Sequence, residues 1–103
     1  MKTYAGDRTI DGIEVLVDGL PLDPHYELQR YSDSGFEWTY EGPEPRQLAF
    51  ALLLDHLGEP RKAAALSERF MREVVANFGN EWEMNSADID QALEAFGASG
   101  AAA

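Results

Sequence analysis

The alternation of hydrophobic and polar residues in the first forty positions is typical of β-strands. Apolar side chains recur at every second position around Val15, as in a strand with one buried face. Asp18 and Gly19 follow directly, and this dipeptide is the strongest short signal for a hairpin turn. Besides the strand around Val15, the pattern predicts strands over residues 2–6, 20–22, 26–31 and 36–40.

The run over residues 36–40 is predicted to carry one aromatic face. Phe36, Trp38 and Tyr40 alternate there with Glu37 and Thr39. We expect Trp38 to be buried, because the apolar helix predicted next needs a sheet to cover it. An aromatic strand is also how some RNA-binding sheets stack bases, but that mode needs basic neighbours, and the neighbours here are acidic.

From residue 43 the hydrophobic period becomes helical. Pro43 and Pro45 indicate a helix start, and Gly58 indicates its end after Leu57. Every residue from 48 to 54 is apolar, which predicts a helix buried on most sides. The other predicted elements are a helix over 60–78, a short strand over 81–84, and a helix capped by Ser86 that stops at Gly97.

These elements predict an α+β fold. An antiparallel sheet of three to five strands, drawn from residues 2–40 with 81–84 as a candidate further strand, is expected to pack against two long helices and one short C-terminal helix. A chain of 103 residues is about one domain's worth, so residues 1–96 are predicted to form a single domain. Residues 97–103 contain only Gly, Ala and Ser and are predicted to form a flexible tail.

Composition excludes several classes of site. The chain has no cysteine, which excludes disulfides, thiol catalysis and cysteine-bound zinc. No run of 18 apolar residues is present, so we expect no membrane association. The first residues contain no apolar stretch of the signal-peptide kind, and we therefore expect a cytoplasmic protein.

Charge is the most unusual property of the sequence. The chain carries 19 acidic and 8 basic residues, a formal net charge of −11. The exception is residues 61–76, which hold four bases and two acids, a net of +2. The pairs Glu68–Arg72 and Arg69–Glu73 favour a salt-bridged helix face there over a nucleic-acid contact. This basic island consists of Arg61, Lys62, Arg69 and Arg72.

Few residues point to catalysis or metal binding. Asp55 and His56 are the nearest approach to an acid–base pair, but neighbours on a helix point about 100° apart. His25 and His56 would need an added acid to hold a metal, and the sequence has no HExxH motif. It also lacks a phosphate-binding loop and a nucleophile elbow. We therefore expect no cofactor, no metal and no enzymatic activity.

Residues 35–49, GFEWTYEGPEPRQLA, resemble the signature of a family of small bacterial and phage proteins known as domain of unknown function 6166. Residues 4–8, 17–22, 55–58 and Trp82 before Ile89 extend the resemblance over about 3–94. The resemblance implies an association with phages and other mobile elements, and no catalytic residues. In the family the loop after the Trp is glycine-rich, whereas Thr39, Glu41, Pro43 and Glu44 stand here. Two carboxylates and a proline in this loop argue against a phosphate-binding role.

The acidic surface and this resemblance together suggest a function. We expect a protein-binding module with a basic partner. More specifically, we expect a stoichiometric inhibitor or modulator of a host nucleic-acid-handling defence complex, of anti-CRISPR or anti-restriction type. Direct nucleic-acid binding is not expected. The alternatives are a self-assembling accessory protein of a phage or plasmid, and a small enzyme using Asp55 and His56. The predicted partner-binding acids are Glu37, Glu41, Glu44, Asp88, Asp90 and Glu94.

Overall fold

The computed structural model describes residues 1–97 and shows the predicted α+β fold. Four strands form one antiparallel sheet in the order β3-β2-β1-β4. The C-terminal strand therefore lies beside the N-terminal one, and the two ends of the domain are joined in the sheet. The strands are β1 (Thr3–Thr9), β2 (Gly12–Val17), β3 (Leu20–Pro21) and β4 (Trp82–Asn85).

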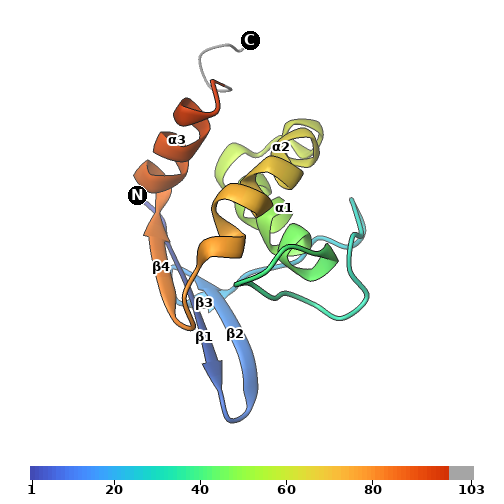
Figure 1. The fold of residues 1–103 in the computed structure, drawn as a ribbon, viewed down its shortest axis with the longest axis vertical. Helices are drawn as coiled ribbons and strands as arrows, with labels where there is room; N and C mark the ends of the chain where they lie inside the picture. The colour runs from blue at the N-terminus through green and yellow to red at the C-terminus, as the bar shows by residue number, and fades with distance from the viewer. Residues whose placement is uncertain (98–103) are drawn as a thin grey trace.

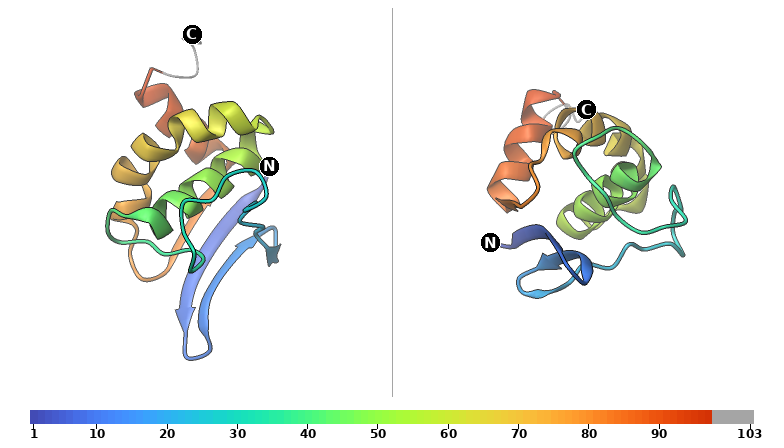
Figure 2. Two further views of the ribbon diagram at one scale, coloured as in Figure 1. Left: turned by 90° about the vertical axis from the view of Figure 1, so that its right-hand side faces the viewer. Right: turned by 60° about the horizontal axis from the view of Figure 1, so that its bottom comes forward.

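The helices lie on one side of this sheet (Figures 1 and 2). They are α1 (Pro43–Leu57), α2 (Pro60–Glu73) and α3 (Ser86–Ala95), with a short 3-10 helix η1 (Val75–Asn77) after α2. The helix predicted over residues 60–78 is thus shorter than expected, because the backbone departs from α geometry at Val74. Asn85, not Ser86, caps α3, and its side chain and that of Asp88 bond each other's backbone N–H groups.

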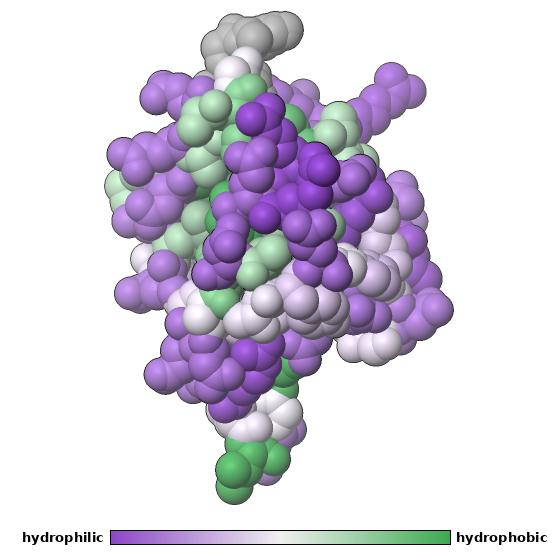
Figure 3. Space-filling model, in the orientation of Figure 1, coloured by the Kyte–Doolittle hydropathy of each residue, from purple (hydrophilic) through white to green (hydrophobic). Residues whose placement is uncertain are grey.

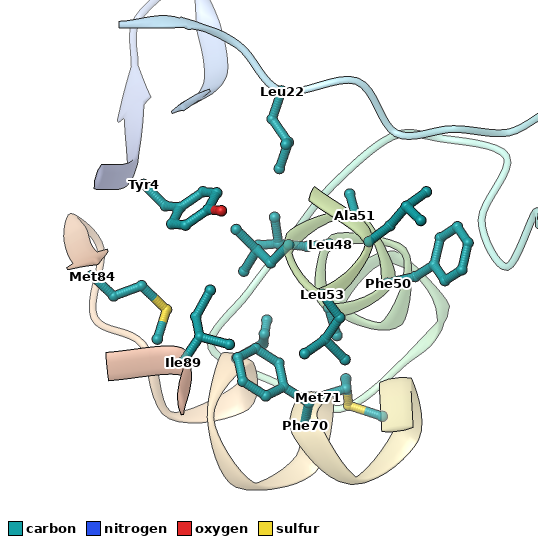
Figure 4. Close-up of a cluster of buried hydrophobic side chains, with 14 of the residues drawn as sticks. Tyr4, Leu22, Leu48, Phe50, Ala51, Leu53, Phe70, Met71, Met84 and Ile89 are labelled. Atoms are coloured by element: carbon teal, nitrogen blue, oxygen red, sulfur yellow. The ribbon is translucent and has the colours of Figure 1, made fainter. Parts of the chain in front are cut away.

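Helix α1 is the centre of the core. Residues 48–54 are all buried, as the sequence predicted. Figure 4 shows why a helix can be apolar all round here: side chains from the sheet, from α2 and from α3 surround it, including Tyr4, Phe70 and Ile89. Gly58 ends the helix in a left-handed conformation with φ of 73°, which glycine adopts without strain.

The strands predicted over residues 26–31 and 36–40 are wrong. Residues 22–42 form a long irregular connection between β3 and α1. Thr39, inside the second range, has a positive φ of 80°, which a β-strand does not accommodate, and His25 and Gly35, directly before the two ranges, have φ of 57° and 84°. Trp38 is nevertheless fully buried, which confirms that expectation although its setting is a loop.

A single buried side chain replaces the hydrogen bonds that a sheet would have supplied to this connection. Gln47 of α1 is fully buried, and its Oε1 accepts the backbone N–H groups of Tyr31 and Ser32 at 2.6 and 3.2 Å. Its Nε2 donates to the backbone oxygens of Pro24 and Gln29 at 2.8 and 3.0 Å. Four backbone groups of the connection are therefore held on α1 by one amide.

Within the described residues, no helix has the length and apolar content to span a membrane. The predicted tail over residues 97–103 lies outside the described residues except for Gly97.

Candidate functional site

The face of the sheet that the helices leave uncovered is the candidate site. Side chains alternate between the two faces of a strand, so Tyr4 and Gly6 of β1 face the helices while Ala5 and Asp7 lie on the opposite face. Both views of Figure 2 place α1 and α2 on one side of the β1–β2 hairpin only. The open face is formed mainly by β1, β2 and β4.

Four carboxylates gather on this open face. Asp7 lies directly opposite Glu14 in the β1–β2 pairing, and Glu83 lies opposite Ala5 in the β1–β4 pairing. Glu81, two residues before Glu83, lines the same hollow of about 430 Å³. Its floor is the half-buried Ala5 and Leu16. We call this set the open acidic face: Asp7, Glu14, Glu81 and Glu83.

No internal partner neutralises these acids. Within residues 1–97, none of the four side chains forms a hydrogen bond or an ion pair. Like charges directly opposite each other in a sheet are destabilising, so the Asp7–Glu14 pair costs folding free energy. The open acidic face therefore carries a concentrated negative charge that the fold itself does not use.

Trp82 fixes β4 at the position that brings two of these acids to the open face. Its indole ring lies against Gly6 on the helix-covered side, where any larger residue would overlap it. The ring also stacks on Phe78 at 4.3 Å and meets the edge of Trp38 at 5.8 Å. Because Trp82 points into the core, Glu83 next to it points to the open face.

The acids predicted in the loop before α1 are placed differently from one another. Glu37 accepts a hydrogen bond from Arg8 at 2.7 Å, and the same guanidinium donates to the backbone oxygen of Trp38. Glu44 accepts from the Tyr40 hydroxyl at 3.0 Å. Glu41 is exposed. Two of the three side chains thus hold the loop together, and Glu41 is the most exposed of the three.

The predicted acids of α3 are also divided. Asp88 belongs to the capping box, and Asp90 lies 2.7 Å from the imidazole of His56. Glu94 is exposed. Asp88 and Glu83 line one small hollow of about 190 Å³ at the start of α3. The N-terminal turn of α3 therefore extends the open acidic face, whereas Asp90 is engaged with α1.

The basic island is spread along α2. Arg61 and Lys62 lie in the first turn of α2, and Arg69 and Arg72 lie in its second half. Arg69 pairs with Glu73 at 2.7 Å, as predicted, and its guanidinium lies 4.5 Å from the ring centroid of Phe96. The other predicted pair, Glu68–Arg72, does not occur in the part of the chain that the structure describes.

Asp55 and His56 do not face each other as an acid–base pair. The Asp55 carboxylate accepts hydrogen bonds from the Tyr4 hydroxyl at 2.7 Å and from Lys2 Nζ at 3.0 Å, while His56 faces Asp90. Burial raises the pKa of the Tyr4 hydroxyl well above its usual value, and the bond to Asp55 raises it further. The two residues tie β1 and α3 to the end of α1.

The sequence reasoning missed all four residues of the open acidic face. The signal was the alternation in residues 4–7, where Ala5 and Asp7 have the opposite phase to the aromatic Tyr4. This alternation alone does not show that Glu81 and Glu83 lie beside Asp7. That depends on the pairing of β1 with β4, which joins residues nearly eighty positions apart.

No curated protein and no solved structure matches the chain. A family model does match, over residues 4–95, which include the three helices, the open acidic face and all of the sheet except Thr3. The chain therefore belongs to a family of unknown function, DUF6166.

Proposed function

We propose that this protein is a binding module that captures a partner with a basic surface through the open acidic face of its sheet. The observation that carries the proposal is the set of four carboxylates around one hollow, none of which has an internal partner within residues 1–97. A charged surface of one sign steers an oppositely charged partner and raises the association rate. A lysine- or arginine-rich partner would also relieve the Asp7–Glu14 repulsion.

The partner class that fits this charge is a nucleic-acid-binding protein. Such proteins present clustered Lys and Arg side chains to phosphates, and an acidic face can occupy the same surface. We propose that the protein inhibits or modulates a host nucleic-acid-handling complex by occupying that surface. This proposal also draws on the link with mobile elements that the sequence resemblance implies.

An apolar projection lies beside the acidic face. Ile10, at the tip of the β1–β2 hairpin, is fully exposed, and Ile13 next to it is 38% exposed. Figure 3 shows the hairpin tip as an apolar projection below a hydrophilic surface. An exposed apolar tip supplies area that becomes buried on contact, which adds affinity to electrostatic steering.

The test compares two double variants that have the same net charge but reverse charges on different surfaces. A partner is first captured from host lysate at low salt, and its association rate is then measured with purified variants. Asp7→Lys with Glu83→Lys is expected to slow association about tenfold or more, since charge steering acts mainly on the association rate. The control, Glu59→Lys with Glu68→Lys, changes the net charge equally on exposed positions of another surface. Equal slowing by both pairs would contradict the assignment of the sheet face.

A third variant tests whether the loop before α1 contacts the partner in addition to the sheet face. Glu41→Lys with Glu44→Lys reverses the two charges of the loop before α1, which the sequence singled out. Slower association with this variant at low salt would assign the loop to the contact as well. An unchanged rate would restrict the contact to the open acidic face.

A further inference from the structure

The connection between β3 and α1 brings together three metal-ligating side chains. Asp23, His25 and Glu27 each offer one ligand atom, and these three atoms lie within 4.8 Å of one another. His25 Nδ1 is 3.2 Å from Glu27 Oε2 and 3.8 Å from Asp23 Oδ2. The imidazole nitrogen thus faces both carboxylates from one short segment.

The segment is held in this conformation by backbone contacts that do not use the three ligand atoms. The backbone oxygen of Pro24, between two of them, accepts from the buried Nε2 of Gln47. The backbone oxygen of His25 accepts the N–H groups of Leu28 and Gln29 at 3.0 and 3.2 Å. A ligand set that is ordered before the metal arrives loses less conformational entropy on binding.

The ligand atoms are also accessible. The side chains of Asp23 and Glu27 are 64% and 65% exposed, and that of His25 is 28% exposed. Asp23 Oδ1 accepts the backbone N–H of His25 at 2.8 Å, which orients the carboxylate and leaves Oδ2 toward the ring. An ion can therefore enter from solvent without any movement of the core.

We propose that Asp23, His25 and Glu27 bind one Zn²⁺ ion. Zinc accepts imidazole nitrogen and carboxylate oxygen at about 2.0–2.2 Å, and two ligands of a tetrahedral ion then lie about 3.4 Å apart. The two separations from Nδ1, 3.2 and 3.8 Å, lie on either side of that value. Two carboxylates neutralise the ion, and water fills the remaining coordination position. The nitrogen ligand favours zinc over Mg²⁺ and Ca²⁺, which prefer oxygen ligands.

The test titrates the full chain with zinc chloride by calorimetry at neutral pH and about 150 mM salt, which screens diffuse binding to the acidic surface. One ion per chain is expected to bind, and magnesium chloride is expected to bind at least tenfold more weakly. His25→Ala is expected to lower the zinc affinity at least tenfold. Glu27→Gln should also weaken binding, and this change at an exposed position leaves the core intact.

The matched control is His56→Ala, which removes the chain's other histidine and its contact with Asp90. Zinc affinity is expected to stay unchanged in this variant. Zinc-induced shifts of amide resonances should centre on residues 23–27. Equal affinity of the wild type and His25→Ala would overturn the proposal. Loss of binding in His56→Ala alone would overturn it too and assign zinc to the other histidine.

Discussion

At the scale of single residues, Trp38 shows how much of the core depends on a side chain in an irregular segment. Its ring is fully buried, lies beside Trp82 and carries the Arg8 guanidinium 4.6 Å from its centroid. Trp38→Ala is expected to lower the free energy of unfolding by about 3–5 kcal/mol, the usual loss for a buried large aromatic. Tyr40→Ala, at a 44% exposed position in the same segment, is the control and should cost about 1 kcal/mol or less. Urea unfolding measures the loss in both variants. A loss for Trp38→Ala as small as the roughly 1 kcal/mol expected for Tyr40→Ala would mean that Trp38 contributes little packing.

Tyr4 gives stability a dependence on alkaline pH. Burial and the bond to Asp55 raise the pKa of its hydroxyl in the folded state above the ordinary value of about 10. The unfolded chain therefore releases this proton first, so the stabilisation is complete below pH 10 and is lost as the pH rises above it. Tyr4→Phe removes this loss. Urea midpoints between about pH 8 and 11 should fall more steeply with pH for the wild type than for the variant. An equal fall in the two proteins would contradict a raised pKa of Tyr4 in the folded state.

At the scale of elements, alternation predicted the strand around Val15 and failed over residues 26–40. In the first case the partner strands lie close by in sequence, and the turn at Asp18 and Gly19 sets the register. In the second case the same period occurs in a loop, because tertiary contacts satisfy its backbone groups. Gln47 bonds the backbone of Gln29, Tyr31 and Ser32, and Arg8 bonds the backbone oxygen of Trp38. No local pattern distinguishes that buried glutamine from a surface one.

Gln47 should therefore control the order of the whole connection. Gln47→Leu keeps the volume of the side chain and leaves buried backbone groups without partners, each of which costs about 1–3 kcal/mol. The amides of Tyr31 and Ser32 should exchange with solvent much faster, and global stability should fall by about 2 kcal/mol or more. Gln91→Leu, at an exposed position of α3, is the control and should change neither quantity. Unchanged exchange at Tyr31 would contradict the anchoring role.

At the scale of the whole molecule, the net negative charge disfavours the approach of nucleic acids. The net charge of −11 opposes a phosphate backbone, and Arg69 is already paired with Glu73. We expect no measurable binding of a short DNA or RNA duplex at about 150 mM salt in fluorescence anisotropy. Micromolar binding that disappears when Arg69 and Arg72 are changed to alanine would reverse this expectation and make the basic island the functional surface.

The sequence alone predicted that the candidate site would be negatively charged, but it did not predict which residues form the site. Composition alone shows an acidic molecule, but which acids are free depends on long-range contacts. Arg8 reaches Glu37, and His56 reaches Asp90, across 29 and 34 residues of sequence. Strand pairing across the chain then places Glu83 beside β1. Acids that look equivalent in the sequence therefore differ in whether they are available to a partner.

The like-charge pair Asp7–Glu14 connects stability with the proposed binding. Glu14→Lys converts repulsion between directly opposite residues into attraction, so the free energy of unfolding should rise by about 0.2–1 kcal/mol. The same change removes a carboxylate from the open acidic face and should slow capture of a basic partner. Glu59→Lys is the control, because it changes the net charge equally at an exposed position outside the sheet.

Urea unfolding at low and high salt measures the first effect, and the gain should shrink as salt screens the pair. Equal stabilisation by Glu14→Lys and Glu59→Lys would mean that only the general reduction of net charge matters. If the Glu14→Lys protein is more stable but associates with the partner at the wild-type rate, the Asp7–Glu14 repulsion is unrelated to binding. The expected result, greater stability together with slower association, would mean that the fold tolerates this repulsion because the charges are needed for a partner.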